Sequence, residues 1–367
     1  MKMRVNWLLQ DHTIIDYICS RMKYITLFLP LVIMMSLFHC NSEINVSSEV
    51  AVEKIPVGPG PEDMVLDSAG GVHRLIISCS ARRDSHKPYG EILSYDLDNG
   101  SQAELIRYNE PDQVLFHPHG IYLDRDMLYV ISHEKEPDYH PILVYRLHGD
   151  SLEFKELIHT ADQHSPNALV TGPGGDLYFV NDSGKRGSLA EKIFKLKRAS
   201  LVRLARAPQG EWNSTVVASH LGYPAGINRI GNSLYVGDAI LNQIHVFQIS
   251  GEELIPEKSV DNLTGVDNIR IYEGELLAPG HVKPFRFIKH TRDPGNRSPV
   301  DVFLANPVTG KTSIIYSTDG SAISAGSTAI IFENHLYICQ IFDPFILRVP
   351  LDNQGLLHFS QGSRDNL

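Results

Sequence analysis

The chain contains little cysteine and no excess of basic residues. Four of its 367 residues are cysteine, and the formal net charge is −10 at pH 7. Nucleic-acid binding needs clustered Lys and Arg, so this charge balance argues against a nucleic acid as a partner. No Cys-x-x-Cys pair occurs, which argues against a zinc site. The two cysteines beyond the N-terminal segment, Cys79 and Cys339, could form a disulfide or remain buried thiols, and the sequence leaves both open.

Common catalytic motifs are absent as well. The chain has no Gly-x-Ser-x-Gly elbow, no Walker loop and no His-Glu-x-x-His sequence. A serine hydrolase of the nucleophile-elbow type, a P-loop nucleotide-binding protein and a zinc peptidase are therefore not indicated. Hydrophobic residues make up 43% of the chain, which is enough for a sizeable core.

The N-terminal segment has the pattern of an export signal. Met22-Lys23 precedes an apolar run over 24–38, which is too short for a comfortable membrane span and is typical of a signal peptide over 22–39. The run ends at Cys40 in a sequence that resembles a bacterial lipobox. We therefore expect an exported lipoprotein anchored to a membrane through Cys40, with soluble secretion as the alternative. Residues 1–21 look like an over-extended start, and residues 40–49 like a polar tether.

The remainder of the chain repeats one unit six times. Each copy begins with a polar or small residue that leads into an apolar segment: Pro61–Leu66, Pro118–Leu123, Pro166–Val170, Pro224–Asn228, Val266–Ile271 and Gly326–Ile331. A second strand follows each one and starts at Leu75, Leu128, Leu177, Leu234, Leu276 and Leu336. Strand-only repeats of this length are the pattern of a β-propeller. The sequence predicts an all-β fold, with one six-bladed propeller over 50–360 and a polar tail over 361–367.

Three further segments complete this prediction. A strand over 50–57 is placed to complete the blade formed by the other terminus of the chain. Ser188 and Glu191 form a capping-box pattern ahead of apolar residues at helical spacing, which predicts a short basic helix at the channel mouth. The polar excursion His290–Ser298 is expected to be a loop.

Equivalent positions of the six copies should meet around the central channel, because the first strand of every blade lines it. These positions are Glu62, His119, Asn167, Ala225, Asp267 and Ser327. Several oxygen donors in one ring suit a hard cation such as calcium. Glu62 and Asp267 together would neutralise a divalent ion.

The motifs of this channel resemble the paraoxonase/arylesterase family. They are Gly60-Pro61-Glu62-Asp63, Phe-His-Pro-His-Gly-Ile over 116–121, Leu128–His133, Pro166-Asn167 and Val-Asp-Asn-Ile over 266–269. The wider group includes propellers of the gluconolactonase and strictosidine-synthase types. The resemblance covers about residues 55–350. It implies a six-bladed propeller that hydrolyses lactones and aryl esters with a catalytic calcium in the channel and a second, structural calcium.

The resemblance also assigns residues. The catalytic calcium would be held by Glu62, Asn167, Asp267 and Asn268, while a further Asn of the family is replaced by Ala225, with Asn228 or a water near the gap. Asp63 and the carbonyl of Ile121 would serve the structural calcium, whose other acidic ligand is replaced by Ala168. His119 would be the base that activates water, His133 would relay the proton, and His281 would line the substrate pocket.

Two other functions compete with this interpretation. A non-catalytic binding module that has lost part of the metal site is favoured by Ala225 and Ala168. A sugar lactonase of the gluconolactonase type would use a divalent metal without a histidine pair. Under the main hypothesis, the partner is a small lactone or ester, and the protein associates with a membrane through the lipid on Cys40. The sequence leaves the oligomeric state open.

Overall fold

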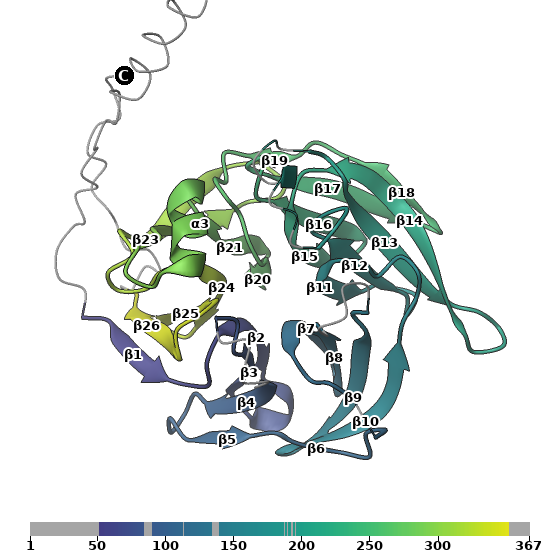
Figure 1. Ribbon diagram of the computed structural model, residues 1–367, viewed down its shortest axis with the longest axis horizontal. Coiled ribbons are helices and arrows are strands. Elements are labelled where there is room, and N and C mark those ends of the chain that lie inside the picture. The colour runs from purple at the N-terminus through teal and green to yellow at the C-terminus, as the bar shows by residue number, and fades with distance from the viewer. Residues whose placement is uncertain are drawn as a thin grey trace, which may run out of the picture. The chain divides into compact units, whose positions relative to one another are not determined.

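The computed structural model describes residues 51–351, apart from residues 84–89, 113, 134–138, 187, 189, 192, 193 and 195. The signal segment, Cys40, the tether and the polar tail lie outside the described residues. Six sheets stand around a central axis, as Figure 1 shows, and their strands pair antiparallel except where β6 (Ile106–Tyr108) pairs parallel with β10 (Ser151–Ile158). The predicted six-bladed propeller is therefore confirmed.

Blades one to three follow each other along the chain, with the first named strand innermost. Blade one consists of β2 (Pro61–Asp67), β3 (Arg74–Ser80), β4 (Gly90–Asp96) and β5 (Gln102–Glu104). Blade two consists of β7 (Pro118–Asp124), β8 (Met127–Ser132), β9 (Ile142–His148), β10 (Ser151–Ile158) and, outermost, β6 (Ile106–Tyr108). Blade three consists of β11 (Pro166–Thr171), β12 (Leu177–Asn181), β13 (Ala199–Arg206) and β14 (Trp212–Leu221).

Blades four to six complete the ring. Blade four consists of β15 (Pro224–Ile230), β16 (Ser233–Asp238), β17 (Gln243–Ser250), β18 (Glu253–Pro256) and the short β19 (Val260–Asp261). Blade five consists of β20 (Arg270–Tyr272), β21 (Glu275–His281), β22 (Val300–Ala305) and β23 (Thr312–Thr318). Blade six consists of β24 (Gly326–Phe332), β25 (His335–Gln340), β26 (Phe345–Pro350) and β1 (Glu53–Pro56).

The last blade is built from both ends of the domain. β1 pairs antiparallel with β26, from Glu53 opposite Arg348 to Pro56 opposite Phe345. Figure 1 shows this pairing where the two ends of the colour scale meet. The predicted closing strand is therefore confirmed. Because the pairing of β1 with β26 closes the ring, the blades hold the channel residues in place around the axis.

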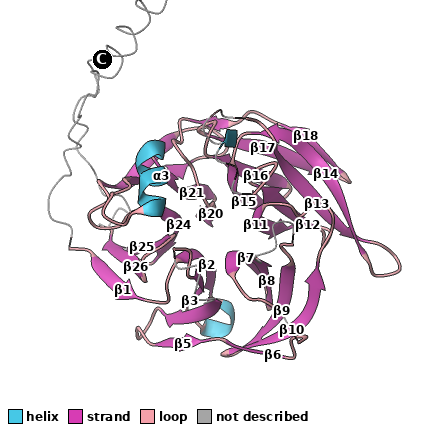
Figure 2. Cartoon of the chain, in the orientation of Figure 1, coloured by secondary structure: helices cyan, strands magenta, loops and turns pink. Residues whose placement is uncertain are grey.

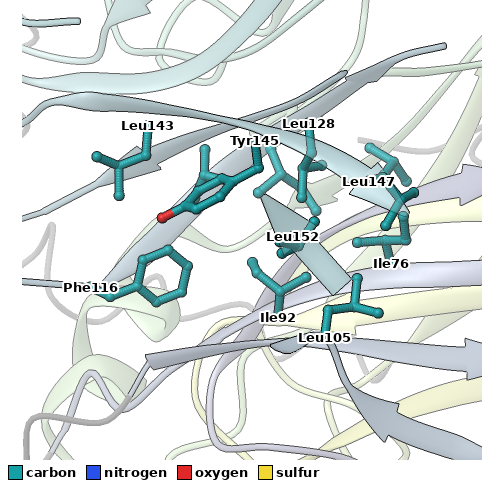
Figure 3. Packing of buried hydrophobic residues seen from close by; sticks show 12 residues of the cluster. Ile76, Ile92, Leu105, Phe116, Leu128, Leu143, Tyr145, Leu147 and Leu152 are labelled. Carbon is teal, nitrogen blue, oxygen red and sulfur yellow. The ribbon is translucent and has the colours of Figure 1, made fainter. Parts of the chain in front are cut away.

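The hydrophobic core lies between the blades rather than along the axis. One cluster joins Ile76, Ile92 and Leu105 of the first repeat to residues of blade two that include Leu128 and Tyr145 (Figure 3). Strand β9 reads Ile-Leu-Val-Tyr-Arg-Leu-His, and its first four side chains are buried because both faces of a central strand are covered by neighbours. The channel is consequently left free for polar groups.

Irregular backbone occurs at the same level of the inner strands. Five of them shift register there: between Pro61 and Asp63, Pro118 and Ile121, Pro166 and Ala168, Pro224 and Gly226, and Gly326 and Ala329. In blade five, regular pairing was expected from Val266, but β20 begins only at Arg270, and Val266 makes an isolated bridge to Gly280. A bulge re-aims a side chain that would otherwise follow the pleat. The six ring positions predicted from the sequence lie in these irregular stretches, whereas the predicted site residues His133 and His281 lie at the ends of second strands.

Two glycines allow the inner strands to converge at this level. A Cβ added to Gly120 would lie 2.1 Å from the carbonyl oxygen of Asn167, and one added to Gly226 would lie 2.4 Å from that of Asp267. Both distances are far below van der Waals contact. Glycine is needed at these two positions because the backbone of the next blade passes there.

Within the part of the chain that the structure describes, helix is confined to short segments between strands (Figure 2), such as the 3-10 turn η1 (Ala69–Gly71) and α3 (Pro284–Arg292). α3 follows β21, and it corrects the expectation of a loop from His290, because the helix continues to Arg292. In the insertion of blade three, the Ser188 hydroxyl accepts a hydrogen bond from the Glu191 amide at 3.4 Å, as the capping pattern predicted. Several other residues of that insertion, at positions 187, 189, 192, 193 and 195, lie outside the described residues. Within the described part of the chain, no helix is long and apolar enough to cross a membrane.

Candidate active site

Glu62 is the central acidic group of the channel, and it is 2% exposed. Its Oε1 accepts a hydrogen bond of 3.1 Å from Nδ2 of Asn268, while its Oε2 has no hydrogen-bond partner. The Ser327 hydroxyl donates to the backbone carbonyl of Glu62 at 2.5 Å. Ser327, which belonged to the predicted ring, therefore stabilises the backbone of Glu62 instead of contributing its oxygen to the channel.

Asn167 is oriented by a buried carboxylate. Its Nδ2 donates to Oδ2 of Asp182 at 3.4 Å, and the Asp182 carboxylate also accepts hydrogen bonds from the hydroxyls of Ser165, Ser183 and Tyr223. Since the amide nitrogen faces Asp182, the Oδ1 of Asn167 is turned away from it, and no group of the described residues meets hydrogen-bond geometry at this oxygen. The Asn167 side chain also interacts with the imidazole of His119. Asp182 is therefore the support of a predicted ligand, Asn167.

Asp267 and Asn268 bring blade five to the same place. Oδ2 of Asp267 lies 3.0 Å from Nε2 of His281, and the Oδ1 of Asn268 is buried without a partner. The imidazole of His281 stacks on Phe287 of α3, with 4.1 Å between the ring centroids. The predicted pocket residue His281 therefore lies between a predicted metal ligand and Phe287 of α3.

The residues at this position fit a hard cation. Among the described residues, no donor meets hydrogen-bond geometry at three buried oxygens: Glu62 Oε2, Asn167 Oδ1 and Asn268 Oδ1. Burial, together with the neighbouring carboxylates of Asp63 and Asp267, raises the pKa of Glu62 to about 8. A bound cation would relieve both the desolvation and the repulsion. The described residues contain no group of three or more His, Cys, Asp or Glu side chains suited to a metal. The site thus depends on amide oxygens, which suit calcium rather than zinc.

The residues expected at a second calcium do not fit one. The buried carboxylate of Asp63 accepts hydrogen bonds from the amides of Met64 and Ile121, the hydroxyl of Thr328 and the guanidinium of Arg270. Ile121 therefore offers this carboxylate its N–H group, and Ala168 offers no side-chain oxygen. Arg270 provides the positive charge that a buried carboxylate requires.

Asn228 does not replace the ligand oxygen that is missing at Ala225. The side chain of Asn228 donates to the carbonyl of Ile269 at 2.9 Å and accepts from the amide of Arg229 at 2.8 Å. Both of its polar groups are therefore engaged with backbone. Any coordination position left by Ala225 would be available to a solvent molecule or to a substrate.

The two predicted histidines lie side by side. The ring centroids of His119 and His133 are 4.6 Å apart, and Nδ1 of His119 is 3.6 Å from Oε2 of Glu62. Neither ring nitrogen of His133 has a hydrogen-bond partner among the described residues. Burial and nearby arginines, Arg82 for His119 and Arg186 for both, hold the pKa of each histidine well below its ordinary value. Both imidazoles are therefore neutral at pH 7.

The two cysteines lie elsewhere. Cys79 of β3 and Cys339 of β25 belong to one core cluster shared by blades one and six, and both are free thiols. Of the two possibilities that the sequence left open, the structure shows the buried thiols.

Comparison with known proteins identifies the family. A family model described as Arylesterase matches residues 84–346. The chain belongs to the arylesterase family. The resemblance indicated by the channel motifs is confirmed, although Glu62 and Asp63 precede the matched range.

Relatives in this arylesterase family share about a quarter of their residues with the chain. Serum paraoxonase/lactonase 3 of Oryctolagus cuniculus is 26% identical over 272 residues, which cover 69% of this chain and 75% of that protein. The protein of the same name from Rattus norvegicus is 23% identical over 283 residues, covering 71% and 73%. Among solved structures, a luciferin-regenerating enzyme aligns with a TM-score of 0.55 at 11% identity, over 83% of this chain and 96% of that one. The last likeness concerns the fold alone.

Sequence reasoning did not single out two arginines of this arylesterase site, Arg82 and Arg270. Arg82 follows β3 in sequence but lies 4.0 Å from Oε2 of Glu62, and Arg270 reaches Asp63 from blade five. No motif marks either residue. Arg82 reaches Glu62 across the pairing of β2 with β3, and Arg270 reaches Asp63 from another blade, which only the folded ring brings near. For Asp182, a signal was present: it follows Asn181 directly at the end of β12.

Proposed function

We propose that the chain is a calcium-dependent hydrolase of lactones or aryl esters. The observation that carries this proposal is the neutral His119–His133 pair, which lies beside a carboxylate and a set of amide oxygens that lack donors. Membership of the arylesterase family supports it. So do the relatives named serum paraoxonase/lactonase 3, at low identity.

Glu62, Asn167, Asp267 and Asn268 would hold the calcium. When bound, calcium polarises the carbonyl of the substrate and stabilises the negative charge that develops on its oxygen. Asn268 and Asp182 prepare the ligands by fixing which atom of Glu62 and of Asn167 remains open. Orientation of ligands by neighbouring hydrogen bonds is typical of protein metal sites.

The histidine pair handles the proton. A neutral imidazole accepts a proton from water as the water oxygen forms its bond to the acyl carbon. The bond between the acyl carbon and the leaving oxygen then breaks, and the proton passes to that oxygen. The low pKa of His119 and of His133 keeps both rings neutral at neutral pH, so that a ring nitrogen of the pair is open to accept this proton.

The missing ligand at Ala225 favours a second candidate, a propeller that binds its ligand without hydrolysing it. The channel would then hold a cation and a carbonyl compound with too weak a polarisation for reaction. The buried nitrogens of His133, which have no hydrogen-bond partner among the described residues, favour the enzyme instead, because a binding module has no need to keep two such groups buried.

A panel of lactones and phenyl esters tests the proposal. The purified chain is assayed in calcium, after treatment with a chelator, and after calcium is restored. Hydrolysis that stops with the chelator and returns with calcium is expected. Hydrolysis limited to sugar lactones and unaffected by replacement of both histidines would indicate the gluconolactonase type. Calcium binding without any hydrolysis would favour the binding module.

A further inference from the structure

Arg82 is anchored to the backbone of three blades. Its Nη1 donates to the carbonyls of Gly60 at 2.6 Å and Ser80 at 3.1 Å, with that of Ile341 at 3.5 Å. Its Nη2 lies 3.3 Å from the carbonyl of Pro118. These acceptors come from blades one, two and six. The guanidinium is therefore held in place by the closed ring and does not depend on a metal for its position.

The same guanidinium contacts the first histidine of the pair. Nη2 of Arg82 lies 3.0 Å from Nδ1 of His119. A guanidinium has only donors and keeps its charge in proteins, so Nδ1 must be the acceptor. A neutral imidazole carries one proton. In His119, that proton must therefore be on Nε2.

This tautomer limits what His119 can do. Its one nitrogen lone pair is already engaged by Arg82, and a proton added there would break the hydrogen bond and place an imidazolium against a guanidinium. Its Nε2 carries a hydrogen and can only donate. The adjacent His133 has no such constraint, since neither of its ring nitrogens has a partner among the described residues.

We propose that Arg82 is a positioning residue that fixes the Nε2–H tautomer of His119, so that His119 donates a hydrogen bond toward the substrate and His133 accepts the proton of water. This division of roles rests on the proposed hydrolase function and reverses the order expected from the sequence. The step balances as before: His133 takes the proton released when the water oxygen bonds to the acyl carbon, and returns it to the leaving oxygen.

The neighbouring residue provides a matched control. Nη2 of Arg83 lies 3.0 Å from Nε2 of His290, and Nη1 lies 3.0 Å from a carboxylate oxygen of Asp343. Arg83 thus makes the same kind of contact to a histidine, but on α3 and outside the pair. Arg83→Met removes a guanidinium next to Arg82 in sequence without touching His119.

The experiment measures the tautomer directly. The full chain, loaded with calcium and labelled with ¹⁵N-histidine, is examined by long-range ¹H–¹⁵N correlation, with His119 assigned from the spectrum of His119→Gln. We expect a protonated Nε2 and an unprotonated Nδ1 in the wild type. Arg82→Met should give a mixture of tautomers, whereas Arg82→Lys, which retains a donor, and Arg83→Met should keep the wild-type pattern.

Activity provides the second readout. Arg82→Met should lower kcat by roughly tenfold or more, since a misoriented catalytic group is costly, and Arg82→Lys should recover part of the loss. A wild-type His119 protonated on Nδ1 would overturn the proposal even if Arg82→Met failed to fold. So would an unchanged tautomer in a folded Arg82→Met variant. A chain with the predicted tautomer but no hydrolysis of any ester would support the effect of Arg82 on His119 and contradict the hydrolase itself.

Discussion

Nδ2 of Asn268 donates a hydrogen bond of 3.1 Å to Oε1 of Glu62, and so joins blade five to blade one across the channel. This single contact decides two orientations at once, because it leaves Oε2 of Glu62 and Oδ1 of Asn268 as the atoms without partners. Both are acceptors in a buried place. The contact therefore leaves two buried oxygens positioned for the cation that we propose.

In the metal-free protein, ionisation of Glu62 should lower the free energy of unfolding as the pH rises. The pKa of this carboxyl is about 8 in the folded protein against an ordinary value of 4.5, so its contribution is fully present below about pH 4.5 and is lost as the pH approaches 8. Thermal melting of chelator-treated protein should show the wild type falling relative to Glu62→Gln between these limits. In calcium, the pH dependence of this difference should disappear or reverse. Parallel curves for the two proteins without calcium would contradict the account.

Arg270 should be essential for folding stability in the absence of a second metal. Its guanidinium bonds the Asp63 carboxylate, which is 1% exposed. Arg270→Met leaves that charge buried and unpaired, which costs about 3–5 kcal/mol. Arg146 pairs with Asp126 at an exposed position, so Arg146→Met should cost only about 0–1 kcal/mol. Denaturant unfolding with and without calcium measures both, and full rescue of Arg270→Met in the presence of calcium would show that Asp63 binds the ion instead.

His133 should matter more for turnover than His119. If His133 accepts the proton of water, His133→Gln lowers kcat by about a hundredfold or more, while calcium affinity is unchanged. His148→Gln, at an exposed position on β9, is the control for loss of an imidazole. Steady-state kinetics on a lactone that the wild type hydrolyses decides this prediction. A His133→Gln enzyme with full activity would remove His133 from the mechanism.

Cys40 should carry the membrane anchor, a prediction that rests on the sequence alone because the segment lies outside the described residues. Cys40→Ser should release the protein from the membrane fraction or leave it unprocessed. Fractionation and mass spectrometry of the mature N-terminus measure this. An unmodified mature N-terminus at another residue would contradict it.

The sequence predicted the ring of channel residues but not the side-chain contacts between them. The six repeats predicted which residues line the channel, because equivalent positions of a propeller meet around its axis. The short strand β1 could be predicted because a strand from one terminus is needed to complete the last blade. The pairings of Asn268 with Glu62, Arg82 with His119 and Arg270 with Asp63 join residues of different blades. They depend on bulge geometry that repeats do not encode. The helix at Pro284 carried a local signal, a proline in its first turn, that the surrounding polar residues obscured.

Calcium titrated into chelator-treated protein tests the central claim most directly, with heat and lactone hydrolysis measured on the same samples. The account predicts about one calcium per chain, with hydrolysis rising in step with binding. Glu62→Gln should weaken both, because it removes charge from the site. Asp98→Asn, which removes a charge of the same sign at an exposed position, should weaken neither. No heat of binding, together with full hydrolysis in excess chelator, would contradict the account.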